Sequence, residues 1–264
     1  MKITDVHSTA VVHPKAEIGE GVVIGPYAVI GPEVTILNGT LIGSHAVIDG
    51  VVRIGKNNRI SPFVSIGQPP QDIKYANEQT EVLIGDNNII REYATIHRAT
   101  TKADMKTEIG SNNFIMAYSH IAHDCKIGNN VVMANNASLA GHVIINDYAI
   151  LGGLVGLHQF VRVGESAFLG AGTLSSLDIP PYTLVAGKGT GNRAKLFGLN
   201  VVGLRRRGFS KDTIEKIKKA YRILFQSSFL MKTAIEKVRS ELSECMQIEP
   251  ILRFIETTKR GICR

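Results

Sequence analysis

The segment VIGPYAVIGPEVTILNGTLIG, residues 23–43, places an aliphatic residue at every sixth position and follows most of them with glycine. A period of six fits neither an α-helix, with about 3.6 residues per turn, nor a continuous strand, with a period of about two. It is typical of a short strand followed by a turn, in which glycine adopts backbone conformations that other residues resist. The segment therefore predicts a parallel β-helix built from hexapeptide repeats.

The same register covers most of the sequence from Val6 to Leu169. Three hexads would close one triangular coil, with successive coils about 4.8 Å apart. A smaller residue four positions after each aliphatic one, such as Val22 or Ala28, would fill the same interior. We therefore expect an all-β domain over residues 1–190, stabilised by the stacking of its coils. The series comprises Val6, Val12, Ile18, Ile24, Ile30, Ile36, Ile42, Ile48, Ile54, Ile60 and Ile66, continues as Ile84, Ile90 and Ile96, and runs again from Ile109 to Leu169.

Two interruptions of the repeat predict loops. Between Ile66 and Ile84 the sequence GQPPQDIKYANEQTEVL abandons the pattern, and we expect a loop that leaves the coil and rejoins it in phase. The step from Ile96 to Ile109 is not a multiple of six, which predicts a second bulge. Loops that project from a rigid scaffold are favoured places for function.

Residues 191–264 have a different pattern and predict a small α-helical C-terminal domain. Ser210 is a suitable N-cap for a helix whose apolar face carries Ile214, Ile217 and Leu224 at helical spacing. Further amphipathic segments cover roughly residues 229–245 and 249–260.

The charge is concentrated in this second part. Residues 1–190 hold 13 basic against 16 acidic residues, whereas residues 191–264 hold 17 against 7. A basic tail suits an acidic partner protein, a phosphorylated substrate, nucleic acid or an anionic membrane. On charge alone, a solvated lysine-rich surface without a partner is an equally good explanation. The tail lacks a nucleic-acid-reading motif, so no nucleic-acid partner is expected.

Other features predict a cytoplasmic protein without an integral membrane segment. The N-terminus lacks the apolar run of a signal peptide. The most apolar segment, residues 149–161, is shorter than the roughly 18 residues that span a bilayer. The three cysteines, Cys125, Cys245 and Cys263, form no CxxC pair, which agrees with a reducing compartment.

Two histidines and an aspartate are clustered at SHIAHDC, residues 119–125, where Ile121 keeps the six-residue register. The 18-residue rule places His123, Gly141 and Gln159 on one edge of three successive coils, with His142 and His158 as immediate neighbours. Histidine is the natural general base at neutral pH, Asp124 could support it, and the Gly141 amide could stabilise an oxyanion.

Two other chemistries are weaker. Strand alternation would put Cys125 on the same side as His123, but nothing marks it as a thiolate nucleophile. Stacked histidines can bind zinc, as in the gamma-class carbonic anhydrases, but the position expected for a third ligand is Val163. No metal site is therefore expected.

The sequence contains the motifs PQDIKY (70–75), TIHR (95–98), YSHIAHDCKIGNN (118–130), MANNASLAGHVIINDYAILGG (133–153), HQFVRVG (158–164), DIPPY (178–182) and NVVGLRRRGFS (200–210). Together they resemble the UDP-N-acetylglucosamine acyltransferases, and the similarity spans essentially the whole chain. The resemblance implies a left-handed coil, although crossovers between parallel strands are usually right-handed. It also implies transfer of a 3-hydroxyacyl chain from acyl carrier protein to the 3-position of UDP-N-acetylglucosamine, the first step of lipid A biosynthesis. No cofactor is implied, because the acyl chain arrives as a thioester. Members of the family form homotrimers with sites between subunits, so the resemblance implies the same assembly here.

The resemblance also implies a role for individual residues. His123 would be the general base, Asp124 its support, and Gly141 the oxyanion donor. Val202 departs from the acidic residue of some members, which leaves the nucleobase contacts open, and Ala171 aligns with the position that limits the acyl tunnel. Residues matching the sugar and acyl site are Gln71, Asp72, Lys74, His120, His142, His158 and Gln159, and those matching the nucleotide site are Asn200, Arg206 and Arg207.

Alternatives remain at this stage. The later N-acyltransferase of the same pathway carries an extra N-terminal domain, whereas hexads here start by Val6. A coenzyme A-dependent hexapeptide acetyltransferase is disfavoured by the basic tail. A non-catalytic solenoid would show flat threonine rows and no His-Asp cluster. Acyl-chain length, and whether the acceptor is a 3-hydroxyl or a 3-amine, stay open.

Overall fold

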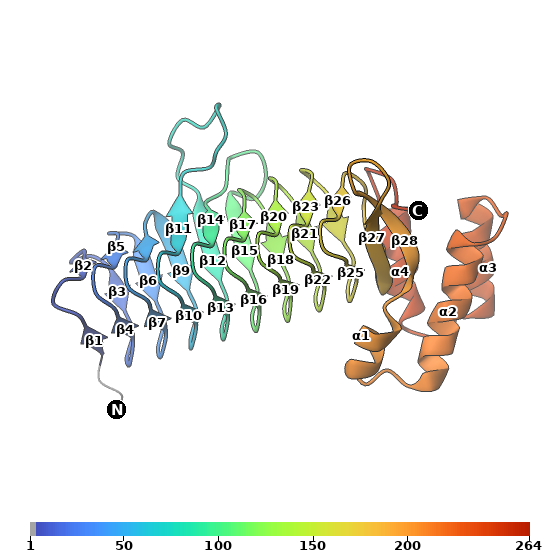
Figure 1. Cartoon of the computed structure of the whole chain (residues 1–264), viewed down its shortest axis with the longest axis horizontal. Coiled ribbons are helices and arrows are strands. Elements are labelled where there is room, and N and C mark those ends of the chain that lie inside the picture. Colours follow the sequence, from blue (N-terminus) through green and yellow to red (C-terminus); the bar gives the residue numbers. More distant parts are fainter. Residues whose placement is uncertain (1–3) are drawn as a thin grey trace.

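The computed structural model describes residues 4–264, and most of them form one elongated parallel β-helix (Figure 1). Short strands stack with like strands of the neighbouring coils to give three flat faces, which we call faces A, B and C. Face A contains β1 (Asp5–Val6), β4 (Val23–Ile24), β7 (Leu41–Ile42), β10 (Arg59–Ile60), β13 (Ile89–Ile90), β16 (Phe114–Ile115), β19 (Val132–Met133), β22 (Ile150–Leu151), β25 (Phe168–Leu169) and β27 (Thr183–Lys188).

The other two faces follow in the same order along each coil. Face B contains β2 (Val11–Val12), β5 (Val29–Ile30), β8 (Val47–Ile48), β11 (Ser65–Gln68), β14 (Thr95–His97), β17 (His120–Ile121), β20 (Ser138–Leu139), β23 (Gly156–Leu157) and β26 (Leu174–Ser175). Face C contains β3 (Glu17–Ile18), β6 (Val34–Ile36), β9 (Val51–Ile54), β12 (Glu81–Ile84), β15 (Lys106–Ile109), β18 (Lys126–Ile127), β21 (Ile144–Ile145) and β24 (Arg162–Val163).

The coil of three hexads predicted from the sequence is confirmed by the strand pairing. Ile24 stacks on Ile42, and Ile121 stacks on Leu139, so the members of each pair are separated by three hexads. The repeated aliphatic residues point inward and are almost completely buried from Ile24 onward. The core is therefore a continuous aliphatic column along the axis of the solenoid.

Both predicted loops are present, and they lengthen their coils by different amounts. Ile84 stacks on Ile54, so the first loop adds the length of two hexads to its coil. Ile84 is therefore one face beyond Ile66 and not one coil beyond it, although their separation in sequence equals that of an ordinary coil. Ile121 stacks on Ile96, so the second loop adds slightly more than one hexad. Figure 1 shows both loops projecting from the same side of the coil.

Four successive coils carry a polar residue at the interior position just before face A, where the sequence pattern predicted a small apolar one. Thr40, Asn58, Asn88 and Asn113 are buried on top of one another. Asn88 Nδ2 donates to Asn58 Oδ1 at 3.0 Å and to the Gly110 carbonyl at 2.9 Å. The Asn113 and Val131 amides continue the ladder, each donating to the asparagine oxygen of the coil before. Each buried polar group of this ladder is thus paired, which removes the cost of burying it.

The coil ends in an antiparallel hairpin of β27 and β28 (Arg193–Leu199), and the domain boundary predicted after residue 190 falls in its turn. The helix predicted after Ser210 is confirmed as α2, whose first turn is capped by the Ser210 hydroxyl accepting from the Thr213 amide at 3.1 Å. The helices pack on one another around a second apolar core. They are α1 (Val201–Arg206), α2 (Lys211–Phe225), α3 (Met231–Glu241) and α4 (Ile248–Glu256). Within residues 4–264, no helix is long and apolar enough to cross a bilayer.

The C-terminal segment returns to the last coil. The Asp178 amide donates to the Gly261 carbonyl, and the Cys263 amide donates to the Asp178 carbonyl, both at 2.9 Å. Asp178 is buried and also accepts hydrogen bonds from Arg162 at 3.0 Å and Thr258 at 2.8 Å. Cys263 is buried in the aliphatic column. The tail that follows α4 is therefore held against the end of the β-helix.

Candidate active site

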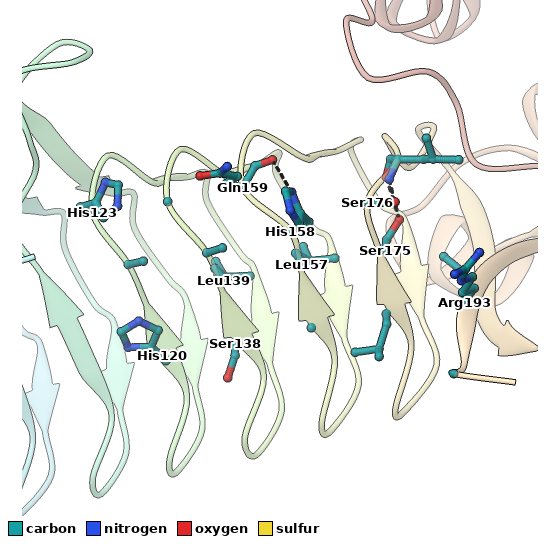
Figure 2. Close-up of a pocket in the computed structure, with 18 of the residues that line it drawn as sticks. His120, His123, Ser138, Leu139, Leu157, His158, Gln159, Ser175, Ser176 and Arg193 are labelled. Carbon is teal, nitrogen blue, oxygen red and sulfur yellow. Dashed lines mark hydrogen bonds between the residues drawn. The ribbon is translucent and has the colours of Figure 1, made fainter. Parts of the chain in front are cut away.

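A cavity of about 1010 Å³ lies along face B (Figure 2). Residues that point outward from successive strands line it, including His120 of β17 and Ser138 of β20. Its rim is the corner between faces B and C, which carries His123, Gly141 and Gln159. The His142 amide donates to the His123 carbonyl at 3.0 Å, so the corners stack directly. The edge predicted from the 18-residue spacing is therefore present.

His123 and Asp124 form a short polar contact at this rim. Asp124 Oδ2 lies 2.8 Å from His123 Nδ1, and the two side chains are 0% and 15% exposed, respectively. The Asp124 backbone is left-handed, with φ of 60°, which turns the chain sharply at this corner. A carboxylate only accepts hydrogen bonds, so Nδ1 carries a proton, and in the neutral imidazole Nε2 then has the lone pair.

Buried threonines from two neighbouring segments hold Asp124 in place. Thr100 donates to Asp124 Oδ2 from its amide at 3.1 Å and from its hydroxyl at 2.7 Å. Thr107 Oγ1 accepts from the Asp124 amide at 2.9 Å. Burial raises the pKa of Asp124, but hydrogen bonds from His123 and Thr100 outweigh it, and the net pKa lies below the usual value. The carboxyl group is therefore an anion at neutral pH.

Gly141 lies against the imidazole of His123. A Cβ atom at position 141 would be within 2.6 Å of His123 Nε2 and still closer to Cε1, so only glycine leaves the imidazole in this position. In the part of the chain that the structure describes, the Gly141 amide N–H donates to no acceptor, whereas its carbonyl accepts from Phe160 at 3.0 Å. A free amide thus lies beside the free ring nitrogen of the histidine.

His142 approaches the same carboxylate from the next coil, with Nε2 3.6 Å from Asp124 Oδ2. Its ring stacks on Phe160 at a centroid distance of 4.4 Å, and burial lowers the pKa of His142. His123, Asp124 and His142 bring three potential metal ligands together. Asp124 Oδ2, the oxygen near both rings, already accepts from His123 and twice from Thr100, whereas Asp124 Oδ1 is buried and has no hydrogen-bond partner among the described residues.

His120 lines the cavity floor and contacts two other residues. Its Nδ1 lies 2.7 Å from Thr95 Oγ1, and burial lowers the pKa of its ring. His97 packs edge-on against His120 at 5.0 Å and is only 7% exposed. Burial, followed by the charges of His120 and His123, lowers the pKa of His97 to about 4. His97 is therefore neutral at pH 7.

The first loop brings Gln71 to the cavity, but Asp72 and Lys74 do not line it. Asp72 pairs with Lys102 of the second loop at 2.6 Å, and this hydrogen bond lowers the pKa of Asp72. The Lys74 amide donates to Asp72 Oδ1 at 3.0 Å, while the Lys74 side chain is exposed. The two loops are therefore linked beside the His123 corner.

His158 and Gln159 line the part of the cavity nearer the C-terminal domain. His158 Nδ1 lies 3.3 Å from the Gln159 carbonyl oxygen and 3.3 Å from Arg260 Nη2. Beyond them the cavity is bordered by Ser176 and Arg193 (Figure 2).

The residues matched to the nucleotide are not in this cavity. Asn200, Arg206 and Arg207 line a second, largely apolar cavity of about 420 Å³ on face A, together with Val202. The Asn200 side chain caps α1 by accepting from Gly203 at 3.0 Å and donates to the Ser166 carbonyl at 2.9 Å. Arg207 pairs with Glu165 and lies 3.9 Å over the Tyr148 ring. One copy of the chain thus keeps the His123 site and the expected nucleotide site on different faces.

One sequence expectation needs correction. Cys125 does not share a side with His123, because it points into the coil core and is completely buried. Burial raises the pKa of the Cys125 thiol to about 12, so it is no nucleophile. Ala171 lines neither of these two cavities and is exposed on the corner between faces A and B, after β25.

Sequence reasoning missed several contributors to the site. Thr100 and Thr107 reach Asp124 across the second loop, whose length the 18-residue rule does not supply. His97 is in the TIHR motif, but the motif alone gives it no role. Arg193 and Arg260 come from the hairpin and the tail, where no repeat exists to place them.

The chain is similar to known acyltransferases over nearly its whole length. Residues 178–263 match the family model for domain 2 of UDP N-acetylglucosamine O-acyltransferase, and residues 106–141 match the bacterial transferase hexapeptide model of six repeats. An acyl-[acyl-carrier-protein]–UDP-N-acetylglucosamine O-acyltransferase of Thermodesulfovibrio yellowstonii is 55% identical over 99% of this chain and 100% of its own. The protein of that name in Syntrophobacter fumaroxidans is 51% identical over 98% of this chain and 99% of its own.

A solved structure supports the same assignment. The UDP-N-acetylglucosamine acyltransferase of Francisella novicida superposes with a TM-score of 0.94, at 45% identity, over 98% of this chain and 94% of that chain. The predicted fold class, a left-handed parallel β-helix followed by a small helical region, is thereby confirmed. By sequence identity and by fold, the chain belongs to the UDP-N-acetylglucosamine acyltransferase family.

Proposed function

We propose that this protein transfers a 3-hydroxyacyl chain from acyl carrier protein to the 3-position of UDP-N-acetylglucosamine, the first step of lipid A biosynthesis. The names of its relatives support the donor and the acceptor. The observation that carries the mechanism is the His123–Asp124 pair, whose free ring nitrogen lies beside the Gly141 amide on the cavity rim.

His123 is the general base of this mechanism. Its Nε2 takes the proton of the sugar 3-hydroxyl as that oxygen attacks the thioester carbonyl carbon. The resulting imidazolium is stabilised by the Asp124 carboxylate, 2.8 Å from Nδ1. Thr100 supports this by fixing the carboxylate oxygen that faces the ring.

Gly141 supplies the oxyanion donor. Attack on the thioester turns the carbonyl oxygen into an anion, and the free Gly141 N–H beside the ring is suitably placed to bind it. When the intermediate collapses, the C–S bond breaks and the thiolate of the carrier's arm takes the proton from His123. Atoms and charge balance without a metal or a cofactor, because the acyl chain arrives activated as a thioester.

The substrate contacts divide between the two cavities. We assign Gln71, His120, His142, His158 and Gln159 to the sugar and acyl portion, since four of the five line the face B cavity and His142 adjoins it through Asp124. Asp72 and Lys74 belong to the loop beside this site. Asn200, Arg206 and Arg207 are assigned to the nucleotide, because they line the face A cavity. Arginine forks suit a diphosphate.

A homotrimer would unite the two cavities. Faces A and B meet at a corner where the rings of Tyr27, His45, Phe63, Tyr93 and Tyr118 stack at centroid distances of 4.8–5.1 Å and are largely exposed. Three copies packed around this corner would set face A of one against face B of the next. Each complete site would then combine His123 of one copy with Arg206 of its neighbour.

Replacing His123 tests the function directly. In His123→Ala, transfer of a 3-hydroxyacyl group from acyl carrier protein should fall at least about 100-fold, the lower range expected for loss of a general base. The melting temperature should stay unchanged, and the exposed His13→Ala is a matched control. Near-normal turnover in His123→Ala would refute the mechanism.

The product identifies the substrates. Wild-type enzyme is given a mixture of acyl carrier proteins with different chains, and UDP-sugars that bear a 3-hydroxyl or a 3-amine. Mass spectrometry of the products then gives both the preferred chain and the acceptor. An absence of product with every UDP-sugar would contradict the proposed function.

A further inference from the structure

The C-terminal tail reaches the cavity of face B through Arg260. Arg260 Nε donates to the Ser176 carbonyl at 2.8 Å, and Nη2 lies 3.3 Å from His158 Nδ1. Both Ser176 and His158 line the cavity, and Figure 2 shows them on the side toward Arg193. Arg260, 102 positions away in sequence from His158, therefore lies beside two residues that line the cavity.

The position of Arg260 is fixed by the fold. The segment around it is bonded to the last coil through Asp178, and Gly261 adopts a left-handed conformation, with φ of 82°, immediately after it. Thr258 on the other side donates to Asp178 Oδ2 at 2.8 Å. The side chain of Arg260 is only partly exposed. These anchors hold the guanidinium at the end of the cavity.

The charge of Arg260 is not balanced by a carboxylate. Among residues 4–264, no acidic side chain forms an ion pair with Arg260 or with Arg193, which lines the same end of the cavity. A guanidinium held by a carbonyl oxygen and an imidazole still has N–H groups available for an anion. Two such cations at one end of a cavity favour a ligand with a phosphate there.

We propose that Arg260, together with Arg193, binds a phosphate group of a substrate at the end of the cavity nearest the C-terminal domain. This rests on the proposed function, which offers two sources of that group. One is the diphosphate of the UDP-sugar, and the other is the phosphate of the carrier's phosphopantetheine arm. Both present the same oxyanion chemistry to an arginine fork.

Kinetics with each substrate varied in turn test the proposal and separate the sources. In Arg260→Gln, the KM of the phosphate-bearing substrate should rise about 10- to 100-fold, the range for loss of a charge-assisted hydrogen bond, while the melting temperature is unchanged. Arg260→Lys should recover part of the loss, and Arg193→Gln should show a smaller rise. Lys259→Gln, an exposed neighbour with the same charge, is the matched control.

The outcomes divide clearly. A raised KM for the UDP-sugar assigns the nucleotide diphosphate. If the KM is raised for acyl-phosphopantetheine but not for acyl-pantetheine, which lacks the phosphate, Arg260 binds the phosphate of the carrier arm. Unchanged KM values for both substrates overturn the proposal, as does a penalty that appears only with a lowered melting temperature and is equal for all donors.

Failure of the proposed function is a separate result. If the wild-type enzyme gives no turnover, calorimetric titration of UDP and of phosphopantetheine into wild type and Arg260→Gln still tests the phosphate site. Weaker binding of either ligand by Arg260→Gln supports it, and binding that is equal in the two proteins, or undetectable in the wild type, rejects it.

Discussion

The Gly141 backbone touches the ring of His123 so closely that the next coil has no space for a side chain at that point. A Cβ there would lie within 2.6 Å of Nε2, the nitrogen that we propose takes the proton. The glycine therefore has two functions, since it leaves space for the base and presents a free amide beside it.

Gly141→Ala should consequently inactivate the enzyme without unfolding it. The Cβ would displace the imidazole, and a shift of about 1 Å at a reacting group can lower the rate about 100-fold. Turnover with saturating substrates and thermal melting are the measurements. Gly153→Ala is a matched control, because the nearest atom to its Cβ is the Asn135 carbonyl oxygen at an ordinary 3.4 Å. Activity of Gly141→Ala equal to that control would contradict our assignment.

The sequence predicts this relationship because both residues belong to uninterrupted coils. Position 123 plus 18 is position 141, and the chain between them has no insertion. The fold follows from the same arithmetic, since one side-chain period determines strand, turn and core at once. The interior asparagines do not follow from it, because most other hexads fill that position with a small apolar residue such as Val22 or Ala28.

The rest of the site could not be predicted from spacing. Thr100 contacts Asp124 from the coil that the second loop lengthens, and nothing in the sequence gives the path of that loop. Arg260 approaches His158 from the tail, where contacts depend on how the helices pack. The prediction for Cys125 is wrong because strand alternation does not hold at a corner, where the left-handed Asp124 breaks it.

His97 predicts a loss of stability in mild acid. Its pKa is lowered to about 4, so between pH 6.5 and 4 the unfolded chain binds a proton there that the folded protein does not. The contribution of His97 to the free energy of unfolding should therefore be fully present above about pH 6.5. It should be lost as the pH decreases toward 4, which lowers the free energy of unfolding by on the order of 2–3 kcal/mol. His120 and His142, whose pKa values are also lowered, act in the same direction.

Urea unfolding from pH 7.5 to 4.5 measures this effect in wild type and in His97→Gln. The variant should have a shallower decrease of unfolding free energy with falling pH, with a remaining slope from the other two histidines. The slope is compared and not the absolute stability, because a buried glutamine brings its own cost. Identical slopes in the two proteins would show that His97 does not titrate as its burial implies.

Ala171 predicts a change in acyl-chain preference. It is exposed on the corner between faces A and B, where neighbouring copies would meet in the proposed trimer. If the acyl chain runs along this junction, Ala171→Met should shorten the available channel. Each methylene that loses its burial costs about 0.8 kcal/mol, so displacing two of them should lower kcat/KM for the longest accepted donor about tenfold. Shorter donors should be unaffected, and an unchanged preference would place the chain elsewhere.

Sites shared between copies predict complementation between inactive variants. His123→Ala damages the face B cavity, and Arg206→Glu damages the face A cavity, which the structure places on different faces of one chain. Each variant alone should be nearly inactive. In trimers formed from equal amounts of both, about a quarter of the junctions should pair an intact His123 with an intact Arg206 of the neighbour.

Mixing the two variants by co-expression with different affinity tags should therefore restore about a quarter of wild-type turnover. The purified complex should have about three times the 28.7 kDa mass of the chain by light scattering. The control is a mixture of the two variants after each has been folded separately into its own trimers. Stable trimers exchange no subunits, so this mixture should stay inactive. If each complete site lay within one chain, no mixture would recover activity, because every chain carries one damaged cavity. Recovery near a quarter therefore identifies a site built from two copies, and no recovery in a confirmed mixed trimer refutes it.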